Sequence, residues 1–70
     1  SVREHMSLVL KRLQGQRFVE FHDLFDPARG IGVLVVTFLA MLELSRESLL
    51  QLTQAEAFAP IYVRLAYTPS

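Results

Sequence analysis

The chain has no cysteine and no tryptophan among its 70 residues, and its charges cancel. Without cysteine, neither a disulfide scaffold nor a thiolate zinc site can form, and this composition fits the cytoplasm. Seven basic and seven acidic residues leave no net charge. A neutral domain has no general attraction to phosphate backbones or to anionic membranes.

Long apolar segments are also missing. The longest, residues 31–44, is too short for a membrane-spanning helix, which needs about 20 residues, and no signal peptide pattern is present. The composition of 51% hydrophobic and 20% charged residues favours one folded domain over disorder. We expect residues 1–70 to form a single domain. Because the sequence lacks an initiator methionine and reads as helical from its start, we expect it to be excised from a longer protein.

The organising segment is Ile31–Leu44, whose single charge is Glu43. Its first half is β-branched, as in a buried strand, but its second half consists of good helix formers. Its length favours one helix. This helix is apolar on almost every side, which is unusual for a small domain.

Two faces of this helix follow from a rotation of about 100° per residue. The broader face predicts an ordinary core stripe, formed by Ile31, Leu34, Val35, Phe38, Leu39, Met41 and Leu42. The opposite face carries smaller apolar residues, Val33, Val36, Ala40 and Leu44, with Thr37 and Glu43 between them. Two alternatives remain open: the domain wraps the helix completely, or a partner covers this second face. Self-association of the isolated domain is a further use of such a face.

The other elements are shorter. Ser1 and Glu4 form a capping box before a clean apolar stripe in residues 2–13, and Gly15 is placed to end that helix. Residues 17–21 predict a short strand and 22–25 a short helix with Leu24 and Phe25 inward. Asp26-Pro27 is an N-cap and first-turn pair that predicts the start of the long helix. Residues 50–54 and 61–65 alternate with period two, as in an antiparallel ribbon.

This order of elements predicts an α+β fold, a winged helix with a three-helix helix-turn-helix core and a two-stranded β-hairpin wing. Such folds often bind DNA, so a nucleic-acid-binding domain of a transcriptional regulator is the alternative function. Base readout requires Arg, Lys, Asn or Gln on the recognition helix. Residues 31–45 contain none of these, and the basic residues are scattered. Sequence-specific DNA binding is therefore disfavoured.

Enzymatic and metal chemistry find little support. His22 with Asp23 and Asp26 resembles a metal or general-base cluster, but no second cluster completes a coordination sphere. Gly30-Ile31-Gly32 lacks the third glycine of a dinucleotide fingerprint. No nucleophile motif surrounds any serine. We expect a non-enzymatic binding domain with no cofactor.

A second candidate binding surface is the predicted wing. The edge of residues 61–66 would leave backbone groups free to extend a partner's sheet. Tyr62, Arg64 and Tyr67 would then point from its wet face, and Tyr and Arg are favoured interface anchors.

At these residues the chain resembles the C-terminal domain of segregation and condensation protein A, the bacterial kleisin. The similarity lies in Val36–Leu44, close to the family's helix block, and continues in Leu50–Gln54, Glu56, Phe58 and Ile61. It extends over essentially the whole chain. Gly30–Gly32 and Ala59-Pro60 depart from the family pattern, at the helix start and the wing turn.

The resemblance implies a role in chromosome condensation and segregation. Kleisins bridge the ATPase heads of an Smc dimer, the C-terminal winged helix docks on one head, and a middle region outside this chain binds the accessory protein B dimer. On this basis we expect a nucleoid-associated protein whose Smc contact uses Val33, Val36, Ala40 and Leu44, with Tyr62 and Arg64 on the wing. The ATP chemistry belongs to the partner.

Overall fold

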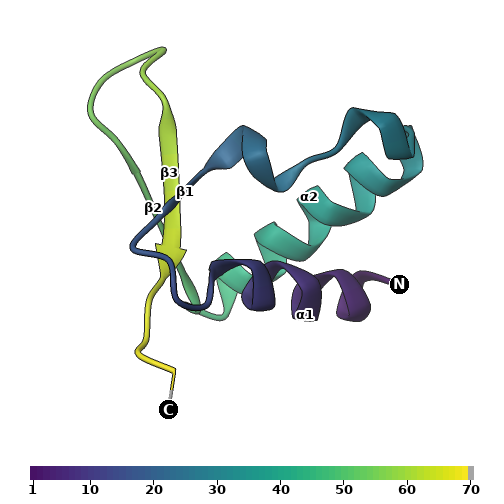
Figure 1. Ribbon diagram of the computed structural model, residues 1–70, viewed down its shortest axis with the longest axis horizontal. Helices are drawn as coiled ribbons and strands as arrows, with labels where there is room; N and C mark the ends of the chain where they lie inside the picture. Colours follow the sequence, from purple (N-terminus) through teal and green to yellow (C-terminus); the bar gives the residue numbers. More distant parts are fainter. Residues whose placement is uncertain (70) are drawn as a thin grey trace.

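The computed structural model describes residues 1–69 and contains helices and one antiparallel sheet. In chain order the elements are α1 (Val2–Leu13), β1 (Val19–Glu20), η1 (Phe21–Leu24), η2 (Pro27–Arg29), α2 (Ile31–Arg46), β2 (Leu50–Gln54) and β3 (Ile61–Leu65), where η marks a 3₁₀ turn. The two α-helices cross on one side of the molecule, and the wing formed by β2 and β3 stands beside the C-terminal end of α2 (Figure 1).

The first helix has the predicted boundaries. The hydroxyl oxygen of Ser1 accepts a hydrogen bond from the backbone N–H of Glu4 at 3.3 Å, which satisfies one of the free donors of the first turn. Gly15 has a φ of +77°, the left-handed conformation that glycine adopts easily after a helix. Val9 and Leu13 of this helix are buried. The capping box and the apolar stripe were therefore sufficient to predict α1.

The start of the long helix differs from the prediction. Asp26 and Pro27 begin η2, where an Asp26 carboxylate oxygen accepts a hydrogen bond from the backbone N–H of Ala28 at 3.0 Å. The helix α2 starts after Gly30, whose φ of +93° and ψ of 166° redirect the chain. The cap residues were recognised correctly, but they cap a single 3₁₀ turn. Gly30 makes the corner that separates this turn from α2.

The sheet has three strands in the order β1-β3-β2. β3 pairs antiparallel with β2 along its whole length, from Leu50 opposite Leu65 to Gln54 opposite Ile61. On its other side, Val63 and Tyr62 pair with Val19 and Glu20 of β1. The prediction of a two-stranded wing whose edge along residues 61–66 stays free is therefore wrong, because Tyr62 and Val63 pair with β1. β3 is the central strand, because the short segment before η1 covers part of its other edge.

One hydrophobic core joins the two α-helices, the three strands and η1. It consists of Val9, Leu13, Val19, Met41, Leu44, Leu50 and Val63, with Phe21, Leu24 and Phe25 packed at its border. Leu24 and Phe25 thus point inward as predicted. The strands contribute one residue each because the sheet covers one end of the helix pair. The arrangement is an α+β winged helix, in which two 3₁₀ turns replace the short second helix and a third strand is added.

Candidate interaction surfaces

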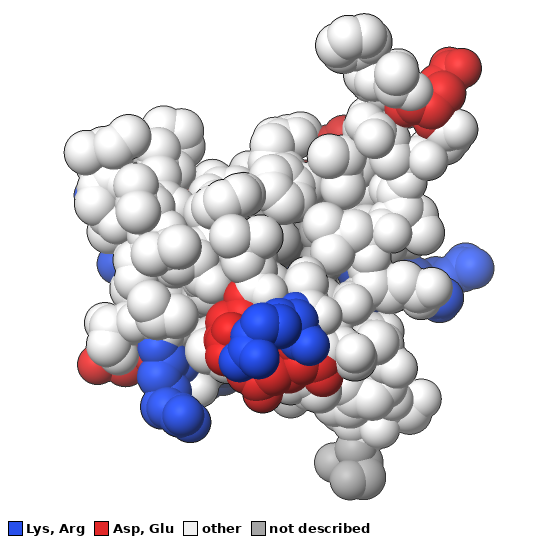
Figure 2. Space-filling model, turned by 180° about the vertical axis from the view of Figure 1, so that it is seen from behind, with Lys and Arg blue, Asp and Glu red and all other residues white. Residues whose placement is uncertain are grey.

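The helix α2 has an apolar face that the rest of the chain leaves exposed. The residues of this face, here called the outer strip, recur at helical spacing and are Ile31, Val35, Phe38, Leu39 and Leu42. The side chain of Ile31 is 76% exposed, and the others are about half exposed. On the side of the molecule drawn in Figure 2, acidic and basic side chains are confined to one compact group and to the margins. The outer strip is therefore an uncharged apolar surface in contact with water.

The predicted assignment of the two faces of this helix is wrong. Ala40 and Leu44, assigned to the partner-covered face, are 0% exposed and belong to the interior. Val33 and Val36 on the same side are half-buried. Of the face predicted as core, only Met41 is buried, and Leu34 is half-buried. Ala40 and Leu44 therefore have no surface to offer a partner while the domain is folded.

The physical reason is close helix packing. α1 and α2 pack against each other, and the buried residues of α2 are Thr37, Ala40, Met41 and Leu44. Large apolar side chains occur on both sides of the helix, since Met41 and Leu44 are buried whereas Phe38 and Leu42 are exposed. Periodicity could not reveal this orientation, because a helix that is apolar all round has no polar face to mark its exposed side. The prediction that the face of Val33, Val36, Ala40 and Leu44 is left for a partner is therefore wrong, although the helix does expose apolar side chains on its other side.

One ion pair limits the outer strip at its C-terminal end. The Arg46 Nε–H donates a hydrogen bond to a carboxylate oxygen of Glu43 at 2.8 Å. This hydrogen bond lowers the pKa of Glu43 below its ordinary value of 4.5 and raises the pKa of Arg46. Because its pKa is lowered on folding, the Glu43 carboxylate contributes stability above pH 4.5. This contribution is lost as the pH falls through the lowered pKa. At neutral pH the opposite charges of Glu43 and Arg46 offset each other, and the carboxylate of Glu47 lies beside the pair.

A second exposed surface lies on the outer face of the sheet. The rings of Phe18 and Tyr62 meet edge to face with centroids 4.8 Å apart. Together with Thr53 and Arg64 they line a shallow depression of about 410 Å³. Tyr62 and Arg64 are exposed, as the alternation of residues 61–65 predicted, and Phe18 was missed. Phe18 lies just before the two residues of β1, too short a strand for alternation to indicate its direction.

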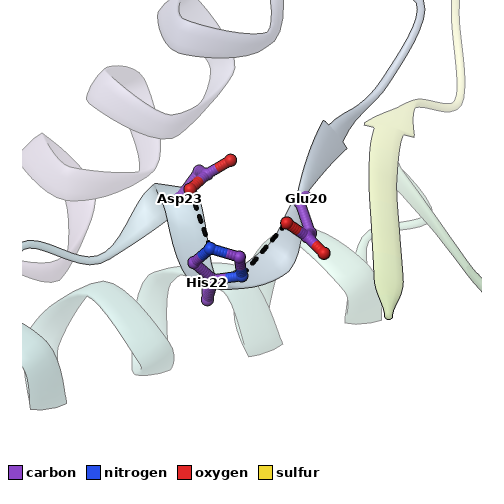
Figure 3. A group of neighbouring side chains, drawn as sticks. All are labelled: Glu20, His22 and Asp23. Carbon is purple, nitrogen blue, oxygen red and sulfur yellow. Dashed lines mark ion pairs between the residues drawn. The ribbon is translucent and has the colours of Figure 1, made fainter. Parts of the chain in front are cut away.

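The histidine cluster has a different membership from the one weighed in the sequence. His22 lies between Glu20 and Asp23, with its Nδ1 3.3 Å from a Glu20 oxygen and its Nε2 3.0 Å from an Asp23 oxygen (Figure 3). Asp26 instead caps η2. The imidazole is 72% exposed and turns one ring nitrogen to each carboxylate. Such exposed pairs contribute little to stability, and the cluster is best described as a solvated surface ion-pair group.

These features define a class of protein. They describe a small winged helix whose longest helix exposes an uncharged apolar strip, a kind of surface that in other proteins marks interaction sites. Within residues 1–69, no helix is both long enough and apolar enough to cross a membrane.

Comparison with known proteins identifies the family. The family model described as "Segregation and condensation protein ScpA" matches residues 1–66. Proteins named segregation and condensation protein A from Coxiella burnetii, Xylella fastidiosa and Listeria monocytogenes are 44%, 46% and 42% identical to this chain. Each alignment covers 91% of this chain and 24%, 21% and 26% of the relative, respectively. The chain therefore belongs to the segregation and condensation protein A family, and it spans about a quarter of the length of these relatives.

Proposed function

We propose that this chain is the C-terminal winged-helix domain of a bacterial kleisin, and that it docks without catalysis on the ATPase head of an Smc protein. Family membership supports a role in chromosome segregation and condensation. In this proposal the full-length protein acts at the nucleoid and binds the accessory protein B dimer through a region outside this chain. The docking role of this domain is supported chiefly by the outer strip.

The outer strip has the chemistry that such a contact requires. Burial of apolar surface drives most protein association, and large apolar side chains in water at helical spacing are typical of a helix that lies in a groove. Phe38 lies near the middle of the strip, with Val35 and Leu42 one turn away on either side. No charged residue occurs within the strip, so its centre can be desolvated without burying an unpaired charge. We therefore assign the centre of the interface to Phe38, Leu39 and Leu42.

The assignment made from sequence is revised accordingly. Val33 and Val36 are half-buried beside the outer strip and remain candidate border contacts. Ala40 and Leu44 are buried and offer no surface to a partner, and Leu44 belongs to the core that includes Val9 and Leu13 of α1. Tyr62 and Arg64, with Phe18, remain a candidate second contact on the wing. They lie on the outer face of the sheet, whereas α2 packs toward its inner face.

A binding measurement with the purified Smc ATPase head tests the proposal. Phe38→Glu and Leu42→Glu each place a charge where the interface would be dry, and we expect each to weaken binding at least about tenfold. Ser7→Glu is the matched control, because it adds the same charge at an exposed position of α1 that belongs neither to the outer strip nor to the depression on the sheet. Circular dichroism should show the same helix content for all three variants.

The wing is tested separately by Tyr62→Ala and Arg64→Ala. If only these two variants lose binding, the contact lies on the wing and the outer strip is not the interface. If no variant changes the affinity, the docking proposal is contradicted. Duplex DNA binding that falls steeply with salt would instead support the regulator hypothesis.

A further inference from the structure

A recess separate from both interaction surfaces lies where four elements meet. It has a volume of about 220 Å³ and is lined by His5 and Arg12 of α1, Asp23 of η1, Arg29 of η2 and Thr37 of α2. Apolar side chains of α1 and η1 complete its wall. Such a volume holds a group of a few heavy atoms. Unlike the outer strip, the recess brings several hydrogen-bonding side chains together.

His5 contributes a buried nitrogen without a partner. Its Nδ1 lies 3.0 Å from the backbone carbonyl oxygen of Ser1, and because a carbonyl oxygen can only accept, Nδ1 carries the proton and donates. Its Nε2 is buried and has no hydrogen-bond partner among the described residues. In the neutral imidazole this nitrogen is an acceptor. An unsatisfied buried polar atom costs stability. Because this nitrogen is buried, a ligand in the recess reaches it only when a lining side chain moves.

Thr37 contributes a polar side chain to the recess from the facing helix. It is 6% exposed and is the one polar side chain classed as buried within residues 1–69. Its hydroxyl takes part in none of the side-chain hydrogen bonds found in this part of the chain. A hydroxyl both donates and accepts, so it suits a ligand of either kind.

The charges around the recess favour an anion. Arg12 and Arg29 form no ion pair within the described residues. Asp23 is the one acidic lining residue, and one of its carboxylate oxygens already faces His22 at 3.0 Å. Two guanidinium groups therefore outweigh one partly engaged carboxylate, although the chain as a whole is neutral.

We propose that this recess binds a phosphate group, held by Arg12 and Arg29 and by the Thr37 hydroxyl, with the His5 ring in its wall. Guanidinium groups bind phosphate through paired charge-assisted hydrogen bonds. A phosphate group offers at least three acceptor oxygens, enough for both guanidinium groups and the hydroxyl. A carboxylate offers two oxygens in one plane and cannot serve all three donors. The ligand class is thus free hydrogen phosphate or a phosphate monoester, and the site does not depend on docking to another protein.

Amide NMR of the chain tests the proposal without any protein partner. Sodium phosphate, phosphoserine and sodium acetate are titrated separately against sodium chloride of equal ionic strength. We expect saturable shifts of the His5 and Thr37 amides with phosphate or phosphoserine, and the tighter of the two identifies the source of the phosphate group. Arg29→Gln and Arg12→Gln should each weaken binding about tenfold, and Thr37→Val should weaken it several-fold.

Arg17→Gln is the matched control, because it removes one positive charge from an exposed position outside the recess. It should leave the affinity unchanged, and all variants should keep the circular dichroism spectrum of the parent chain. Shifts that do not saturate, or that chloride reproduces, overturn the proposal. Equal binding of acetate, or equal weakening by Arg17→Gln, overturns it as well, since either result indicates only general attraction of anions.

Discussion

Leu44 and Leu42 are the same residue type two positions apart on one helix, yet the fold uses them in opposite ways. Leu44 is fully buried in the core and Leu42 is about half exposed on the outer strip. Truncating a buried leucine removes apolar contact and leaves a cavity, whereas truncating an exposed one changes little.

This contrast gives the residue-scale prediction. Leu44→Ala should lower the free energy of unfolding by about 2–5 kcal/mol, a large part of the stability of so small a domain. Leu42→Ala should change it by about 0.5 kcal/mol or less. Urea denaturation followed by circular dichroism measures both. Equal losses in the two variants would mean that the outer strip is covered in solution.

The residue scale also shows where sequence reasoning reaches its limit. Alternation correctly predicted that Tyr62 and Arg64 are exposed, because a half-buried strand distinguishes its two faces. On α2 the same reasoning assigned Ala40 and Leu44 to the wrong side. Nearly every residue of that helix is apolar, so the choice of buried face depends on which side fits α1. That choice is made by tertiary packing and leaves no trace in the local pattern.

At the scale of elements, the start of α2 depends on two glycines with different tasks. Gly30 has a φ of +93° and forms the corner between η2 and the helix, whereas Gly32 lies inside the helix and has no positive φ. A Cβ added at either position meets no atom within 4 Å, so any difference between them arises from the backbone alone.

We therefore predict opposite signs for the same substitution. Gly30→Ala should destabilise the domain by about 1–3 kcal/mol, because an L-residue is strained in that conformation. Gly32→Ala should stabilise it by about 0.5–1 kcal/mol, because alanine loses less conformational freedom in a helix. Thermal unfolding of the two variants beside the parent chain measures the difference. A stabilising Gly30→Ala would show that the corner is not formed in solution.

The elements themselves were largely predictable, and the exceptions share one cause. Both long helices and both wing strands carry periodic apolar patterns over several residues, which fix their type and nearly their boundaries. The short strand predicted over residues 17–21 is present, but it consists of the two residues of β1, and η2 has three residues, so neither is long enough to carry a period. β1 becomes a strand only because β3 offers it hydrogen bonds, and η2 becomes a separate turn only because Gly30 breaks the chain direction.

In the isolated domain the outer strip is exposed to water, and a second copy of the chain could cover it. An apolar face on a neutral chain meets little charge repulsion from a second copy, so concentration should favour pairing of outer strips. We predict that sedimentation velocity of the isolated chain shows a weak, concentration-dependent dimer. Phe38→Glu should abolish it, and Ser7→Glu should not. A monomer at all concentrations would show that the strip is too small to associate by itself.

The position of β3 at the centre of the sheet also affects how the domain folds during synthesis on the ribosome. Both neighbouring strands precede it in the chain, and neither pairs with the other. While the polypeptide emerges, α1 and α2 can already associate, but no ladder can close until Ile61–Leu65 has left the exit tunnel. Both ladders of the sheet therefore become possible at the same moment, when β3 emerges, and not one after the other.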